Sequence, residues 1–144
     1  MQVRYFQGKD VTEVYDIACT SLRENYNPTI FLELSPFWRE GFIVIEEMGQ
    51  IVGFVFGIMV SRVEARVLML AVRNGLRGKG LGRFLMTQFV HECTKKGVKV
   101  ISLEVRESNL SAKRFYDKLG FSTAGKIEKY YSDGENGIAM QLFL

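Results

Sequence analysis

Residues 67–83 read VLMLAVRNGLRGKGLGR and contain the strongest structural signal in the chain. The first six residues, Val67 to Val72, are all apolar, which predicts a buried strand. From position 81 onward apolar residues recur at helical spacing as Leu81, Leu85, Phe89 and Cys93. The stretch therefore predicts a strand, a glycine-rich loop and a helix, in that order.

The loop between the strand and the helix has the properties of an anion site. Backbone N–H groups at a helix start lack intrahelical partners, and the helix dipole favours negative charge there. Glycines at 78, 80 and 82 let a ligand approach the backbone. Arg73, Arg77, Lys79 and Arg83 are expected to cluster there and to add positive charge. We interpret the loop as a phosphate or pyrophosphate site. An ordinary tight turn with a solvated basic face remains the alternative.

The spacing of the glycines excludes two common phosphate loops. Gly75 and Gly80 have the separation of the Walker pattern, but Leu81 and Gly82 follow instead of Lys and Ser or Thr. The glycines at 78, 80 and 82 also miss the interval of the dinucleotide-binding fingerprint.

Composition limits the function further. The 144 residues are 47% hydrophobic and 24% charged, which predicts one globular domain spanning residues 1–144. A net charge of +3 is too small to indicate a DNA partner. No signal peptide or 18-residue apolar run is found, so a cytoplasmic protein without membrane binding is expected. Cys19, Cys93 and His91 lack metal-site spacing, so no metal is expected.

Outside this stretch, the N-terminal half predicts a strand around Val3, a helix from about Asp10 to Arg23, and a meander. The strands of the meander are expected at 42–47, 51–59 and 66–72, with a hairpin around Gly49. Between the helix and the meander, residues 25–40 are irregular and aromatic. They are expected to form a helical loop that lines a pocket or packs on the core.

The C-terminal half continues with a strand at 98–105, parallel to 66–72 because a helix joins the two. Ser108 or Asn109 is expected to cap a short helix that buries Leu110, Tyr116 and their helical neighbours. A closing hairpin at 121–130 and 138–144 completes a mixed, mostly antiparallel sheet of about seven strands with about four helices. The predicted fold class is therefore α/β.

Two motifs are spread along the chain. The first is Arg77-x-x-Gly80-x-Gly82 after an apolar strand, and the second runs from Leu103 to Asn109, with Ala112, Tyr116, Gly120 and Phe121. They resemble the two halves of the coenzyme A signature of the GNAT superfamily of N-acetyltransferases, and the resemblance covers nearly the whole chain. Tyr130-Tyr131-x-Asp133-Gly134-Glu135 and Arg23-Glu24-Asn25-Tyr26 resemble the branch of N-terminal protein and ribosomal-protein alanine acetyltransferases, although Arg23 stands where the branch has proline.

The resemblance implies a sheet that splays open between its central parallel strands, with acetyl-coenzyme A (acetyl-CoA) as co-substrate in the opening. The pantetheine arm would then bond to the backbone of Leu70, Ala71 and Val72, and the Val72 N–H would stabilise the oxyanion. The pyrophosphate would bind the amides of the segment Arg77-Gly78-Lys79-Gly80-Leu81-Gly82-Arg83, helped by Asn109.

Direct attack by an amine within a ternary complex also needs an acid and a base. The resemblance implies that the Tyr116 phenol protonates the leaving thiolate, although spacing alone favours a core aromatic. Glu104 and Glu24 compete for the role of base; Glu24 could instead be a solvated helix end, and Glu104 an outward strand residue. Tyr26, Tyr130 and Tyr131, with Glu24, match residues that hold the acceptor, while the tyrosine pair could instead pack the last hairpin.

Three functions remain open at this stage. The first is acetylation of the α-amine of a protein or peptide N-terminus, with ribosomal proteins or nascent chains among the expected acceptors. The second is acetylation of a small-molecule amine or a lysine side chain, and the third is a coenzyme A-binding regulatory module without catalysis. Glu104 and Tyr116 favour an enzyme, and the tyrosine pair favours the first function. A monomer or weak homodimer is expected.

Overall fold

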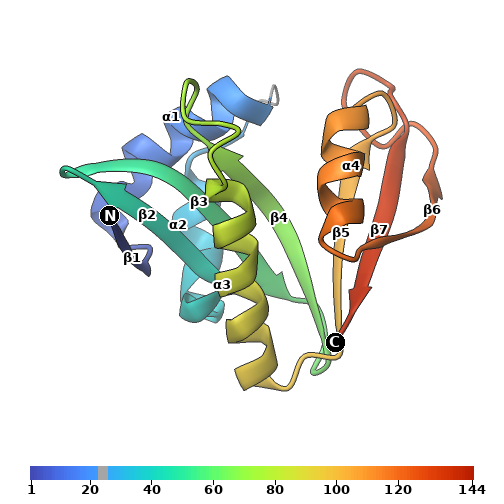
Figure 1. Ribbon diagram of the computed structural model, residues 1–144, viewed down its shortest axis with the longest axis horizontal. Helices are drawn as coiled ribbons and strands as arrows, with labels where there is room; N and C mark the ends of the chain where they lie inside the picture. The colour runs from blue at the N-terminus through green and yellow to red at the C-terminus, as the bar shows by residue number, and fades with distance from the viewer. Residues whose placement is uncertain (23–25) are drawn as a thin grey trace.

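A computed structural model describes residues 1–22 and 26–144 and contains one mixed sheet with helices on both faces (Figure 1). Within these residues the sheet has seven strands in the order β1-β2-β3-β4-β5-β7-β6. The strands are β1 (Gln2–Tyr5), β2 (Phe42–Glu47), β3 (Gln50–Met59), β4 (Glu64–Val72), β5 (Val100–Arg106), β6 (Ser122–Ile127) and β7 (Gly137–Phe143). The α-helices are α1 (Val11–Leu22), α2 (Thr29–Leu34), α3 (Leu81–Lys96) and α4 (Leu110–Lys118), and the 3-10 turns are η1 (Gly8–Asp10), η2 (Ser35–Phe37) and η3 (Arg39–Gly41). The predicted α/β fold is confirmed.

The sheet separates two hydrophobic cores. On one face α1 and α2 pack against β2, β3 and the upper part of β4, with Phe31 fully buried against Phe42, Phe54 and Phe56. On the other face α3 and α4 bury the residues that the helical spacing predicted, including Leu85, Phe89 and Cys93. The irregular segment 26–41 thus packs on the core, as one of its two interpretations expected.

The two central strands are parallel but pair over a short distance. β4 and β5 are in register only at Glu64 with Val100, Ala65 with Ile101 and Arg66 with Ser102. Beyond Arg66 the strands diverge, and Figure 1 shows the upper ends of β4 and β5 well apart. We call this space the β4–β5 opening. It confirms the splayed parallel pair.

Local turn chemistry accounts for most of the predicted boundaries. Met48 and Gly49 both have positive φ and close the β2–β3 hairpin. Gly97 ends α3 in the left-handed conformation with its N–H bonded to the carbonyls of Cys93 and Thr94. Asn109 caps α4 by accepting a hydrogen bond from the Ala112 N–H at 3.1 Å.

Two local predictions are wrong. The side chain of Leu110 was expected to face inward, yet the residue is 57% exposed because it opens the first turn of α4 at the protein surface. The strand expected at 121–130 ends at Ile127, and residues 128–136 form a loop whose backbone bonds join Tyr131 to Glu135 and Gly134 to Tyr131. This β6–β7 loop carries Tyr130 and Tyr131.

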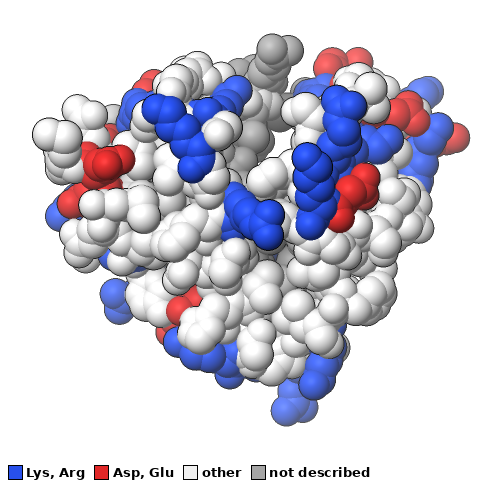
Figure 2. Space-filling model, in the orientation of Figure 1, with Lys and Arg blue, Asp and Glu red and all other residues white. Residues whose placement is uncertain are grey.

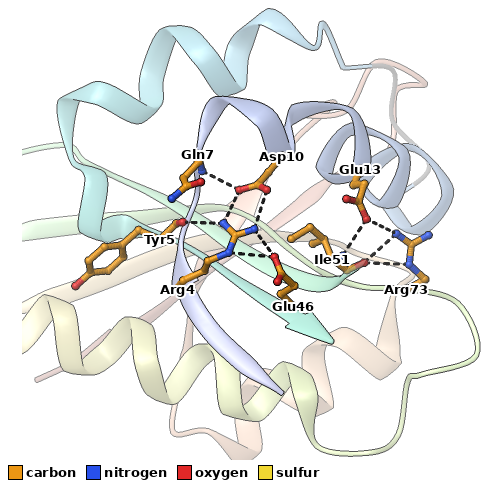
Figure 3. A network of polar contacts seen from close by, with 8 residues as sticks. All are labelled: Arg4, Tyr5, Gln7, Asp10, Glu13, Glu46, Ile51 and Arg73. Atoms are coloured by element: carbon orange, nitrogen blue, oxygen red, sulfur yellow. Dashed lines mark hydrogen bonds and ion pairs between the residues drawn. The ribbon is translucent and has the colours of Figure 1, made fainter. Parts of the chain in front are cut away.

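Two arginines connect α1 and the preceding turn η1 to the sheet (Figure 3). Arg4 on β1 donates to both carboxylate oxygens of Asp10, at 2.7 and 2.9 Å, and to Glu46 on β2 at 2.7 Å. Arg73, directly after β4, donates to the carbonyl of Ile51 at 2.9 Å. It also forms longer ion pairs, at 3.7 Å, with Glu13 and Asp16 of α1. Together these contacts fix the position of the helix relative to the end of β4.

Candidate active site

The edge of β4 that lines the opening carries the backbone groups expected to bind the cofactor. The Arg73 N–H donates to the Val52 carbonyl on β3 at 2.8 Å. Since successive N–H groups of a strand point to opposite edges, the amides of Val72 and Leu70 face the opening, while Ala71 faces β3. The Val72 carbonyl accepts from Ser21 Oγ at 3.2 Å and from Arg77 Nε at 3.4 Å. These contacts, with the bond from the Arg73 N–H, hold the peptide between Val72 and Arg73 in one orientation.

The glycine-rich loop continues from this edge into the start of α3. Gly78 and Gly80 have φ of 77° and 84°, a region that only glycine adopts without strain. Gly80 is the N-cap of α3 and provides no side chain to bond the first-turn amides. Those amides, which start at Leu81 and include Gly82 and Arg83, are therefore left for an anion.

The basic residues of this segment divide into two groups. Arg77, Lys79 and Arg83 are exposed at the loop and the first turn of α3. Arg73 was expected to belong with them, and that prediction is wrong. Its guanidinium turns back to Ile51 and α1 (Figure 3), because Glu13 and Asp16 lie within 4 Å.

A second basic wall faces this one across a hollow. Figure 2 shows Lys and Arg gathered over the loop that leads into α3 and again over α4, with the surface recessed between them. The basic residues of α4 are Lys113, Arg114 and Lys118. A polyanionic ligand would find positive charge on both sides of the opening.

Tyr116 on α4 lies inside this arrangement and is 9% exposed. Its ring packs edge-on against Phe115 and Phe121, with centroids 5.0 and 5.4 Å away. Burial, with a smaller contribution from nearby Tyr131, raises the pKa of Tyr116 well above its ordinary value. The phenol is therefore protonated at neutral pH. Tyr116 is a core aromatic, as its spacing predicted, and its role as an acid stays a prediction.

Glu104 lies on the opposite face of the sheet, since Leu103 and Val105 on either side of it pack with the α3–α4 core. Its side chain is only 10% exposed. The Glu104 carboxylate pairs with Arg66 of β4 and accepts a hydrogen bond from the Tyr130 hydroxyl at 3.1 Å. Glu104 is therefore paired and largely buried, and its role as the base stays a prediction.

The predicted tyrosine pair adjoins Glu104. Tyr130 and Tyr131 meet edge-on with ring centroids 4.9 Å apart, and the Arg106 guanidinium lies 4.3 Å above the Tyr131 ring. Burial raises the pKa of Tyr131, and the negative charge of Glu104 and the nearby phenol of Tyr26 add smaller contributions in the same direction. Tyr26 packs against the α1–α2 core, and Tyr131 is linked to Glu104 through the ring and hydroxyl of Tyr130.

One predicted site residue, Asn109, stands apart from this cluster. Asn109 uses its Oδ1 to cap α4, so only its amide NH₂ is left for a ligand. Glu24, the competing base, lies outside the described residues. Among the residues that are described, no group of His, Cys, Asp and Glu is arranged to hold a metal ion. No described helix has both the length and the apolar character needed to cross a membrane.

The arrangement of loop, opening and carboxylate agrees with a family match. Residues 11–121 match the family model described as "Acetyltransferase (GNAT) family". The chain belongs to the acetyltransferase (GNAT) family. The predicted enzyme class is thereby confirmed.

Individual members of the family extend this similarity over the whole chain. A putative ribosomal protein bS18-alanine N-acetyltransferase of Bacillus subtilis is 32% identical over 140 residues, which cover 96% of this chain and 92% of the relative. The catalytic subunit ard1 of the N-terminal acetyltransferase A complex of Schizosaccharomyces pombe is 30% identical, covering 97% and 84%. The crystal structure of Ard1 from Thermoplasma volcanium superimposes with a TM-score of 0.96 at 40% identity, covering 99% and 97%. The resemblance to the N-terminal and ribosomal-protein acetyltransferases is confirmed.

Within this GNAT fold, sequence reasoning missed three contacting residues. Arg66 binds Glu104, Ser21 binds the Val72 carbonyl, and Arg106 covers Tyr131. One signal was available for Arg66. Polar residues alternate along the sequence of both parallel strands as the structure bounds them, at 64 and 66 and again at 102, 104 and 106, which is typical of two strands that present a shared polar face.

Proposed function

We propose that this chain transfers the acetyl group of acetyl-CoA to the α-amine of a protein or peptide N-terminus, by direct attack within a ternary complex. Relatives named for ribosomal-protein alanine and N-terminal acetylation, which match nearly the whole chain, support this acceptor class. Residues 1–144 would act as one acetyltransferase domain, in keeping with the continuous sheet.

One observation carries the proposal: two chemically suited groups flank the β4–β5 opening from opposite faces of the sheet. Tyr116, kept protonated by burial, lies on the α3–α4 face, and the Glu104 carboxylate lies on the α1–α2 face. The Val72 amide faces the space between them. An acid, a base and an oxyanion donor are the groups that amide formation from a thioester requires.

In this assignment the cofactor would occupy the α3–α4 side. The first-turn amides of α3 and the exposed Arg77, Lys79 and Arg83 suit the pyrophosphate. The open edge of β4 at Leu70 and Val72 would hydrogen-bond the pantetheine arm as an added strand does. Acetyl-CoA would supply the acyl group and the thiolate leaving group.

The acceptor would then approach from the α1–α2 face, where Tyr130 contacts Glu104, Tyr131 packs against Tyr130, and Tyr26 packs against the core of that face. Glu104 would take a proton from the amine as it attacks, directly or through water. An α-amine has a pKa of about 7.7–8.0, against about 10.4 for lysine. An N-terminal amine therefore loses its proton more easily, and it needs less help from a carboxylate base. Attack forms the C–N bond, Val72 N–H stabilises the oxyanion, and Tyr116 protonates the departing sulfur.

The experiment compares one peptide in two forms. The first form has a free N-terminus and acetylated lysines, and the second has a blocked N-terminus and free lysines. With acetyl-CoA and the wild-type protein, mass spectrometry should find a mass increase of one acetyl group on the first form only. Acetylation of the second form at an equal rate would replace the α-amine proposal by a lysine-directed enzyme. Binding of acetyl-CoA without turnover of either form would support the regulatory module.

A further inference from the structure

Two side-chain contacts cross from β4 to β5 at the base of the opening. Ser102 Oγ donates to Glu64 Oε2 at 2.9 Å, and one step further along both strands Arg66 Nη2 donates to Glu104 Oε1. Both contacts join residues 38 positions apart, so they are consecutive rungs on the same face. The lower rung lies where the backbones still pair. The upper rung reaches from the last paired residue of β4 to a residue of β5 beyond the pairing.

The upper rung has a third member. The Tyr130 hydroxyl accepts from Arg66 Nη2 at 2.6 Å and donates to Glu104 Oε1 at 3.1 Å. Arg66, Glu104 and Tyr130 thus form a closed ring of hydrogen bonds from three separate elements. Such a ring restrains the Glu104 carboxylate at a point where the backbones of β4 and β5 no longer pair.

The contacts on Glu104 are distributed unevenly between its two oxygens. Arg66 and Tyr130 both bind Oε1, and within the described part of the chain Oε2 has no protein partner. A base must present a lone pair within hydrogen-bond reach of the proton that it removes. Because two donors fix Oε1, the position of Oε2 on the same carboxylate is fixed as well.

We propose that Arg66 is a positioning residue for acetyl transfer: together with the Tyr130 hydroxyl it holds Oε1 of Glu104 so that Oε2 faces the acceptor amine. This proposal rests on the proposed function, in which Glu104 is the base. Arg66 acts through Glu104 and does not itself contact the reacting atoms. The guanidinium suits this task because it is planar and can donate to two acceptors at once.

A double-mutant cycle tests the proposal. Steady-state rates are measured for the wild type, Arg66→Met, Glu104→Gln and the double variant with a free N-terminal peptide. We expect Arg66→Met to lower kcat/KM for the peptide about 10-fold or more, with KM for acetyl-CoA unchanged. In the Glu104→Gln background the same substitution should cost nothing further, because the oxygen that Arg66 positions no longer acts as a base. Equal losses in the two backgrounds would overturn the proposal.

Ser102→Ala provides a matched control, because it removes the lower rung at the same strand junction and leaves Glu104 untouched. We expect its kcat/KM to stay within about 2-fold of wild type. A loss as large as that of Arg66→Met would mean that the contact between β4 and β5, and not the orientation of the Glu104 carboxylate, determines the rate. That result would overturn the proposal. Arg66→Lys keeps the charge and one donor, so it should recover part of the rate. It replaces Arg66→Met in the cycle if thermal unfolding shows that the methionine variant does not fold.

Failure of this proposal can be told from failure of the proposed function. Wild-type acetylation of free N-termini is measured before any variant is compared, and its absence counts against the proposed function alone. If the wild type acetylates free N-termini and Glu104→Gln is as fast, the proposed acceptor class stands and the role of Arg66 is overturned.

Discussion

Gly82 of α3 lies directly against the ring of Phe115 of α4: a Cβ built on Gly82 would meet Phe115 Cζ at 3.3 Å. This contact brings together the two helices that flank the β4–β5 opening. Gly80, two residues earlier, has open space around it but a φ of 84°. The two glycines of the motif are thus required for different reasons, Gly82 for close helix packing and Gly80 for its backbone conformation.

Gly80→Glu should abolish acetyl-CoA binding, because it puts a carboxylate where the first amides of α3 would meet the pyrophosphate. Calorimetric titration should show at least a 100-fold loss of affinity. Gly75→Glu is the matched control, since Gly75 has a similar φ of 88° and equally open surroundings in the same loop. Both variants carry the same backbone strain. Equal affinities in the two variants would disprove the placement of the pyrophosphate at Gly80.

Tyr116→Phe removes the hydroxyl and keeps the buried ring. If the phenol protonates the thiolate, kcat should fall about 10²-fold while the affinity for acetyl-CoA changes little. The rate is measured by stopped assays of peptide acetylation. Tyr5→Phe is the control, because it deletes a phenol that donates to Glu92 at 2.9 Å at the far edge of the sheet. If both variants keep the wild-type rate, Tyr116 is a core aromatic and nothing more.

The same substitution has a consequence for stability at high pH. Burial raises the pKa of Tyr116, so above about pH 10 the unfolded chain releases a proton that the folded chain keeps. The free energy of unfolding of the wild type should therefore decrease as pH rises above about 10. Tyr116→Phe should show a smaller decrease. Urea unfolding between pH 8 and pH 11 measures both slopes, and identical slopes would contradict the raised pKa.

Local sequence signals predicted the parts of the fold that depend on neighbouring residues. The apolar run before Arg73, the glycines around Gly80 and the helical spacing after Gly82 depend on contacts within a few positions, and all three agree with the structure. The capping of α4 by Asn109 was predictable for the same reason.

Side-chain partners across the fold were not predictable in this way. The contact of Arg66 with Glu104 spans 38 residues and depends on the register of two strands, which no local pattern determines. Arg73 stands beside the glycine-rich loop in sequence, yet Glu13 and Asp16 of α1 attract its guanidinium away from the loop. Proximity in sequence to the motif was therefore a poor guide to its role.

Asp10 is the buried charge that anchors α1, and its loss should be costly. Asp10 is 3% exposed and receives two hydrogen bonds from Arg4 and one from the Gln7 N–H at 2.8 Å. Asp10→Asn should lower the free energy of unfolding by about 2 kcal/mol at pH 7, since a charged hydrogen bond is lost in a buried place. Glu46→Gln, at a more exposed partner of Arg4, should cost less than about 1 kcal/mol.

The pH dependence of these variants provides a second check. Burial alone would raise the pKa of Asp10, but the hydrogen bonds from Arg4 and Gln7 outweigh it and lower the pKa below its ordinary value. A lowered pKa means that this contribution is complete above about pH 4 and is lost as pH falls through the folded-state pKa. The difference between wild type and Asp10→Asn should therefore shrink below pH 4. A constant difference down to pH 2.5 would contradict the assignment.

Gly137 determines where the Tyr130 ring can lie. A Cβ built on Gly137 would come within 3.0 Å of Tyr130 Cδ2 and 3.2 Å of Tyr130 Cβ and Cγ, so Gly137→Ala must push the ring aside. The Tyr130 hydroxyl would then lose its short contacts with Arg66 and Glu104. We expect kcat/KM for an N-terminal peptide to fall about 10-fold, with the affinity for acetyl-CoA unchanged, because the cofactor would lie on the other face of the sheet.

Gly125→Ala on neighbouring β6 is the matched control, since a Cβ there meets nothing within 4 Å. It should behave as wild type in the same peptide assay, with thermal unfolding confirming that both variants fold. Tyr130→Phe separates the ring from its hydroxyl: if the hydrogen bonds matter, it should lose as much as Gly137→Ala although the ring is undisturbed. If Gly137→Ala and Gly125→Ala acetylate the peptide equally fast, Tyr130 packs the last hairpin and has no part in binding the acceptor.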